Sequence, residues 1–273
     1  MATRFLTNNV IDNATLFAYP SEYSGLPVSN VKKLSKSLVA RLQSTPPSSF
    51  SEVQGTLAGQ ANTINCFIIC GHNFKSSTIL NIKLYSDYSY TSGSLLWSSG
   101  PFTVPSIRAT DTYNVNINIP IWLPESIENV AAFSFTMQDD TLNYFQIYRL
   151  FAGEYFDSSI GASLNNTWYY NDNSKQYRTD FGSLRTDIVT PSKLIDFDLG
   201  TINDLERSSL ARSLASVGMY KEFFISVFKN SCDETIKPLK ELDYSGVVKL
   251  ISVPKYTEFA NKYYNTKIVV EEV

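Results

Sequence analysis

The sequence is poor in the side chains that most often carry metal or nucleophilic chemistry. Its 273 residues include one histidine, three cysteines and three methionines. A structural zinc site needs four ligands, typically from paired cysteines and histidines. Three cysteines cannot all pair with one another, so a disulfide scaffold is not indicated either. These shortages argue against a metal-stabilised or disulfide-stabilised domain, and we expect no cofactor.

Long apolar runs and strong charge are also missing. No window approaches the ~20 apolar residues that span a bilayer, and the N-terminal stretch MATRFLTNNVIDNATLF lacks the apolar segment of a signal peptide. The net charge is -3, and no basic run stands out. Binding to nucleic acid or to an anionic membrane is therefore not indicated. We expect a soluble protein, synthesised in a cytoplasm, without membrane insertion.

Aromatic and small polar residues are abundant instead, with 17 Tyr and 17 Phe among the 273 residues. This composition favours strands over helices. The chain before residue 158 contains short strand candidates separated by turn residues, at 38–44, 51–57, 64–70, 79–87, 94–100, 113–121, 130–138 and 144–156. The sequence therefore predicts a mainly β protein, with an antiparallel jelly-roll β-sandwich over residues 1–157.

Residues 158–193 are polar and rich in tyrosine, without an apolar run long enough for a core strand. We therefore predict an extended arm or long loop, with one hairpin at most. Loops of this length are usually functional or mobile, so this segment is a candidate contact surface. Large aromatic side chains are enriched at protein interfaces. The predicted interaction surface consists of Trp168, Tyr169, Tyr170 and Tyr177.

Residues 194–273 predict a small α+β module with the order β-α-β-β, packing on or extending the sandwich. Asn203 and Glu206 have the spacing of a capping box at the start of a helix, and Gly218 is placed to end it. The apolar stripe expected on the buried face of this helix is Leu210, Leu214 and Val217. Strands are expected at 193–199, 221–228, 246–252 and 266–273.

The stretch NCFIICGHNF, residues 65–74, gathers two cysteines and the single histidine. On a strand, Cys66 and Cys70 would lie about 13 Å apart, too far for a disulfide or a shared metal. Cys70 and His72 would be about 6–7 Å apart, beyond hydrogen-bond reach. We interpret the cysteines as core residues on a strand buried on both faces. His72 and Asn73 would then bond local backbone in a turn.

Carboxylate pairs offer no better case for catalysis. Asp196 and Asp198 share a strand face, which is typical of a solvated face and only rarely of a calcium site. The sequence contains no G-x-S-x-G, P-loop or H-E-x-x-H pattern. We predict that the protein is not an enzyme.

Several short motifs together resemble bacteriophage virion proteins built on a galactose-binding-like, or discoidin-like, jelly roll. The stretch DNATLFAYPSEYSGLPVSNVKKLSKSLVARLQST is similar to their N-terminal signature, and CGHNF is similar to a strand end of that family. The matching residues of the signature are Asp12, Ala14, Thr15, Leu16, Leu26, Pro27, Val28, Asn30 and Arg41. LLWSSGPFTV resembles its D-S-G-W turn, although Ser98 replaces the aspartate and Trp97 comes earlier. The tail, residues 194–228, is similar to the C-terminal module of such proteins.

The resemblance implies a non-enzymatic virion structural protein of a phage tail or tail tip. Its partners would be other virion proteins and copies of itself, and its location the virion. The alternative is a carbohydrate-binding module that contacts host-surface polysaccharide. Its expected stacking aromatics are Tyr88, Tyr90 and Trp97 or, alternatively, Trp168 to Tyr170. A polysaccharide depolymerase ranks third.

Overall fold

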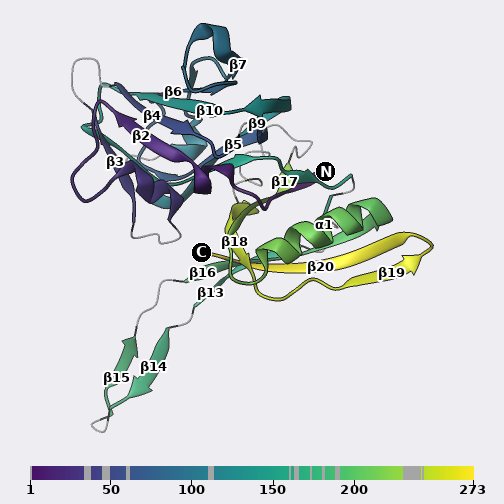
Figure 1. Ribbon diagram of the computed structural model, residues 1–273. Helices are drawn as coiled ribbons and strands as arrows, with labels where there is room; N and C mark the ends of the chain where they lie inside the picture. The colour runs from purple at the N-terminus through teal and green to yellow at the C-terminus, as the bar shows by residue number, and fades with distance from the viewer. Residues whose placement is uncertain are drawn as a thin grey trace. The chain divides into compact units, whose positions relative to one another are not determined.

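The computed structural model divides into two compact units, which are described separately (Figure 1). One unit is Asn8–Tyr155, and the other combines Met1–Thr7 with Phe156–Val273. The residues described are 2–33, 38–44, 50–59, 62–109, 114–159, 161–162, 166–172, 174–179, 182–187, 191–229, 241 and 243–273. Among these residues, no helix is long and apolar enough to cross a membrane.

The unit Asn8–Tyr155 is a sandwich of two antiparallel sheets, as the sequence predicts. The first sheet has the order β2-β4-β10-β6-β7, and β8 also pairs with β6. Its strands are β2 (Thr15–Tyr19), β4 (Phe50–Thr56), β10 (Ala132–Gln138), β6 (Ile79–Tyr85), β7 (Leu95–Ser98) and β8 (Phe102–Thr103). The second sheet has the order β3-β11-β5-β9. Its strands are β3 (Ala40–Gln43), β11 (Tyr144–Gly153), β5 (Asn62–His72) and β9 (Asn114–Val130). Short 3-10 turns flank them, at η1 (Val10–Asn13), η2 (Val28–Lys32), η3 (Ser92–Ser94) and η4 (Ser106–Arg108).

Apolar side chains that alternate along these strands meet between the two sheets. Phe67 on β5 contacts Phe133 and Phe135 on β10, with ring centroids 5.6 and 5.8 Å apart. Gly55 on β4 faces the same layer, where an added Cβ would lie 2.2 Å from the Phe133 ring. The glycine is required there because the aromatic ring already occupies the space of a side chain. The sandwich is thus closed by a densely packed aromatic core.

β5 is buried on both faces, as the apolar run CFIIC predicts. Arg149 on β11 lies opposite Cys70 of β5. Its guanidinium donates to the backbone oxygen of Val31 at 3.0 Å and lies 2.7 Å from the Asp12 carboxylate. Both partners come from the N-terminal turns η1 and η2, so this segment of the same unit lies against the second sheet.

The other unit is built on one antiparallel sheet with the order β12-β1-β17-β18-β20-β16-β13, and β19 also pairs with β20. Its strands are β12 (Phe156–Asp157), β1 (Ala2–Leu6), β17 (Phe223–Lys229), β18 (Ser245–Leu250), β20 (Tyr263–Glu272), β16 (Ser192–Asn203), β13 (Thr167–Asn171) and β19 (Tyr256–Ala260). A separate two-stranded sheet pairs β14 (Lys175–Arg178) with β15 (Leu184–Asp187).

The predicted helix is present as α1 (Asp204–Val217), which lies along β16 and β20 (Figure 1). Asn203 and Glu206 form the predicted capping box. The Glu206 N–H donates to Asn203 Oδ1 at 2.9 Å, and the Asn203 N–H donates to Glu206 Oε2 at 3.0 Å. The helix ends at Gly218, whose φ of 58° is accessible to glycine at little cost. Its buried face is the predicted stripe of Leu210, Leu214 and Val217.

The division of the chain differs from the predicted one at two places. Residues 1–7 belong to the C-terminal unit and not to the sandwich, because β1 pairs with β12 and β17. Phe5 anchors this strand, with its ring 6.1 Å from Phe156 and 6.2 Å from Phe197. The predicted arm over 158–193 also contributes to the sheet, since β13 pairs with β16 along five residues.

Candidate functional site

The reactive residues of NCFIICGHNF lie in the core of the sandwich unit. Cys66 and Cys70 are buried on β5, as predicted. His72 is fully buried, and its Nδ1 accepts a hydrogen bond from the Phe74 N–H at 3.1 Å. The predicted local bond of His72 is therefore confirmed. Within the described residues, no group of three or more His, Cys, Asp or Glu could hold a metal.

Burial also decides the protonation of this histidine. Desolvation, with a smaller contribution from the nearby positive charge of Arg108, lowers the pKa of His72 from 6.5 to about 3. Asn73 does not bond locally, contrary to prediction. Its side chain donates to the Tyr144 oxygen at 3.0 Å and accepts from the Gln146 N–H at 2.8 Å. The Asn73 amide therefore fixes the end of β5 to β11.

The outer face of the first sheet carries a different set of side chains. On the edge strand β2, Phe17 and Tyr19 point away from the core and are 56% and 61% exposed. Leu16 and Ala18 point the other way and pack against the core. Residues two apart on a strand share a face, so the two rings stand side by side on one surface.

Strand pairing places polar side chains next to these rings. Phe17 lies opposite Gln54, and Tyr19 lies opposite Glu52, on β4. The same rows continue over β10 and β6. We call this surface the polar–aromatic face, and it consists of Phe17, Tyr19, Glu52, Gln54, Asn81, Lys83, Ser134 and Thr136. Across four strands spaced about 4.8 Å apart it is roughly 14 Å wide.

Glu52 stands at the centre of the polar–aromatic face. Its Oε1 accepts hydrogen bonds from the Ser134 hydroxyl and from Gln54 Nε2, the latter at 3.1 Å. Both bonds go to one carboxylate oxygen. Within the described residues, no side-chain hydrogen bond uses Oε2, which leaves that oxygen as an acceptor. The Glu52 carboxylate is therefore held in a fixed orientation with one oxygen available to a ligand.

Two tyrosines border the same face at the β6 end. Tyr85 and Tyr90 pack edge to face, with ring centroids 5.4 Å apart. Burial, followed by the nearby charge of Glu52 and the Tyr85 ring hydroxyl, raises the pKa of Tyr90 to about 12. Burial and then Glu52 also raise the pKa of Tyr85. Both phenols therefore stay protonated and can donate a hydrogen bond.

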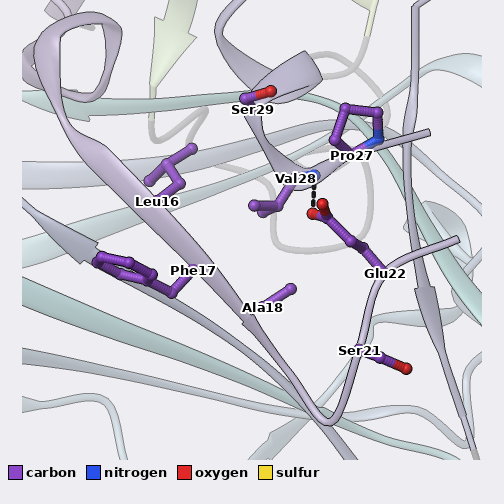
Figure 2. Close-up of a pocket in the computed structure, with 8 residues that line it drawn as sticks. All are labelled: Leu16, Phe17, Ala18, Ser21, Glu22, Pro27, Val28 and Ser29. Carbon is purple, nitrogen blue, oxygen red and sulfur yellow. Dashed lines mark hydrogen bonds between the residues drawn. The ribbon is translucent and has the colours of Figure 1, made fainter. Parts of the chain in front are cut away.

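A hollow of about 510 Å³ lies between β2 and residues 21–29 (Figure 2). Phe17 lines this hollow as well as the polar–aromatic face. Figure 2 shows Glu22 reaching towards η2, where its carboxylate accepts from the Val28 N–H at 2.6 Å. The remaining lining residues are Leu16, Ala18, Ser21, Pro27 and Ser29. The hollow combines an apolar wall with one carboxylate whose position is fixed by a backbone bond.

The structure places Tyr88, Tyr90 and Trp97, which are predicted to stack on glycan, in different surroundings. Tyr90 borders the polar–aromatic face, where its ring packs against Tyr85. Tyr88 is exposed in the connection between β6 and β7. Trp97 pairs with Leu84 and packs against the core, so it is only partly exposed. Phe17 and Tyr19 were missed because every residue from Leu16 to Tyr19 is apolar or aromatic, which hides the alternation of a strand.

The predicted interaction surface lies in the C-terminal unit. Trp168, Tyr169 and Tyr170 are consecutive on β13, the last strand of the sheet order. Trp168 and Tyr170 are in edge-to-face contact, with centroids 5.7 Å apart. Tyr177 is on β14, in the separate two-stranded sheet, where all eight residues are exposed. The first three residues of the predicted surface therefore share one strand, and Tyr177 lies on a different one.

The sandwich unit belongs to the class of antiparallel jelly-roll β-sandwiches and presents one polar–aromatic sheet face. No protein-family model matches the chain, and no curated protein sequence matches it.

Among solved structures, the chain is similar to chitosan-binding module 1 of a chitosanase/glucanase from Paenibacillus sp. IK-5. The identity is 13% and the TM-score 0.40, over 54% of this chain and 99% of the module. It is also similar to the family 32 carbohydrate-binding module of C. perfringens NanJ, solved with galactose. There the identity is 14% and the TM-score 0.41, over 57% of this chain and 99% of that one. A third module, from Clostridium perfringens and solved with GalNAc-β-1,3-galactose, gives 10% identity and a TM-score of 0.37, over 54% and 100%.

These identities and TM-scores are too low to transfer a ligand from those modules to this chain. They also lend no support to the predicted virion role, which stays a prediction.

Proposed function

We propose that the sandwich unit binds carbohydrate on its polar–aromatic face. The observation that carries the proposal is the position of Phe17 and Tyr19, both more than half exposed, beside the row of Glu52 and Gln54. Exposed aromatic rings offer a flat apolar surface to the C–H face of a sugar ring. A fixed carboxylate and amide beside them match sugar hydroxyls, which both donate and accept hydrogen bonds.

The rigidity of the face favours binding over a purely structural role. Phe17 and Tyr19 are on a strand paired with β4, and Tyr19 packs edge to face against Phe50 at 6.4 Å. The Glu52 carboxylate is oriented by two bonds before any ligand arrives. Groups held in place lose little entropy on binding. The width of the face, roughly 14 Å, accommodates more than one sugar ring.

The experiment is a glycan array followed by affinity electrophoresis in gels that contain the best polysaccharide. We expect Phe17→Ala and Tyr19→Ala each to weaken binding about tenfold, the loss of one well-placed aromatic contact. Tyr88→Ala is the comparison variant, since it removes an exposed ring from the connection between β6 and β7 of the same unit. Loss of binding in Tyr88→Ala and not in Phe17→Ala would move the site to the β6–β7 connection. No glycan binding at all would contradict the proposal.

Assembly is the second candidate, and the exposed aromatic strand β13 is the observation that favours it. Within it, a place in a phage tail rests on the sequence resemblance alone. Mass spectrometry of purified particles checks that role, and absence of the chain from them would contradict it.

A further inference from the structure

We propose that β13 is a dimerisation strand, which pairs with β13 of a second copy of this chain around a two-fold axis. In the described part of the chain, β13 has β16 as its only strand neighbour. The side of β13 away from β16 is therefore a sheet edge. Such an edge offers backbone N–H and C=O groups to another strand.

This edge lacks the devices that natural proteins use to prevent pairing. The strand sequence is TWYYN, with no charged residue and no proline, and the first charge after it is Asp172. Protected edges are usually very short, bulged, or marked with lysine or proline. The opposite end of the same sheet is protected in this way, since β12 has only two residues, Phe156 and Asp157. β13 is the unprotected end.

The exposed aromatic rings on β13 suit an interface with another strand that carries aromatic rings. Trp168, Tyr169 and Tyr170 are 36%, 49% and 62% exposed. Their rings are large and apolar, and exposed aromatics in a row are typical of an interface and not of a solvated edge. Pairing with another strand would cover the rings while satisfying the backbone groups beside them.

The sequence of β13 is self-complementary in one antiparallel register. With Tyr169 on the two-fold axis, Trp168 lies opposite the second copy's Tyr170, and Tyr169 lies opposite the second copy's Tyr169. Thr167 and Asn171 then meet at the ends of the pair. Every aromatic residue therefore faces an aromatic residue and every polar residue a polar one, a pattern that stabilises antiparallel strand pairs.

The two faces of the paired strands would differ. Trp168 and Tyr170 already contact each other within one chain, with ring centroids 5.7 Å apart and planes at 89°. The two-fold axis would extend this pair into a row of four rings on one face. The two copies of Tyr169 would meet on the other face. Because the interface uses the same strand from both copies, it closes at two and does not propagate.

The register dictates a charge-swap experiment on the full chain. Since residue 169 meets itself, Tyr169→Glu and Tyr169→Lys each place like charges opposite one another, and we expect each variant alone to dimerise at least about tenfold more weakly. An equimolar mixture of the two variants places opposite charges in contact and should restore dimers, as heterodimers. Sedimentation velocity and native mass spectrometry from low-micromolar to high-micromolar concentration measure both results.

Two controls keep a folding defect apart from a pairing defect. Tyr220→Lys changes a tyrosine that is 74% exposed outside β13 and should leave dimerisation unchanged. Far-UV circular dichroism should show the same fold in all variants. A monomeric wild-type chain at high-micromolar concentration would overturn the proposal. So would a dimer that Tyr169→Glu and Tyr169→Lys leave intact, or a mixture that shows no heterodimer.

Discussion

Arg149 Nη1 lies 2.7 Å from Asp12 Oδ1, and this ion pair joins β11 to the turn η1 inside the sandwich unit. The Arg149 side chain is only 1% exposed. Its guanidinium also lies 4.8 Å from the ring of Phe151. Asp12 accepts a second bond from Asn9 Nδ2 at 2.7 Å. The aspartate of the N-terminal motif therefore compensates a buried positive charge.

Removing that aspartate is expected to destabilise the sandwich. Asp12→Ala removes the carboxylate that lies beside the buried Arg149 charge, which costs about 3 kcal/mol of unfolding free energy, the lower end for a broken buried pair. The lower end applies because the Asp12 side chain is 26% exposed. Urea unfolding followed by tryptophan fluorescence measures the change. Asp140→Ala, at an exposed position, should change stability by less than about 0.5 kcal/mol. Equal stability of the two variants would contradict the role of the pair.

The local elements were predictable because their signals are short in range. The capping box of Asn203 and Glu206, and the alternation of Ile195 and Phe197 with two aspartates, depend on neighbours a few residues apart. The apolar run around Ile68 likewise predicts a strand buried on both faces. Each of these signals follows from the geometry of a single helix or strand.

The candidate site could not be predicted in this way. Phe17, Glu52, Ser134 and Lys83 lie on four strands that are far apart in the sequence, and only strand order brings them together. Nothing in the sequence states that β10 lies between β4 and β6. The strand β13 could not be predicted either. Its residues are exposed on both faces, so its sequence does not show the alternation of apolar and polar residues that marks a half-buried strand.

Gly55 offers a test of how tightly the two sheets are packed. A Cβ at this position would lie 2.2 Å from the ring of Phe133, closer than real contacts allow. Gly55→Ala should therefore cost about 2 kcal/mol through overpacking. Phe133→Leu alone should also destabilise, but the double variant should lose less than the two single losses together, because the smaller side chain makes room. Urea unfolding of the four proteins gives the coupling, and strict additivity would contradict the predicted clash.

Glu52 tests the polar half of the proposed carbohydrate face. Glu52→Gln keeps the shape of the side chain but removes its charge, and hydrogen bonds to charged groups are worth about 1.5–3 kcal/mol. We expect roughly tenfold weaker glycan binding, and far-UV circular dichroism should show that the fold is retained. Isothermal titration calorimetry with the best glycan of the array measures the affinity. Glu128→Gln, outside this face on β9, is the matched control. If both variants bind as the wild type does, Glu52 has no part in recognition.

His72 makes the stability of the sandwich depend on pH in a defined window. Its pKa is about 3 in the folded chain, against 6.5 ordinarily, because burial opposes the charged form. Between these two values the unfolded chain binds a proton that the folded chain does not. Stability from this residue is therefore complete above pH 6.5 and is lost as the pH falls, by about 1.4 kcal/mol per pH unit down to pH 3.

Two measurements check this expectation. Since His72 is the single histidine of the sequence, its imidazole signals can be followed by NMR without ambiguity, and they should not titrate between about pH 8 and pH 5. In urea unfolding across the same range, His72→Asn should show a shallower loss of stability below pH 6.5 than the wild type, because the substituted chain has no imidazole to protonate when unfolded. The carboxylates titrate alike in both proteins, so they cancel in the comparison. An imidazole that titrates near 6.5 in the folded protein would show that His72 is not sealed in the core.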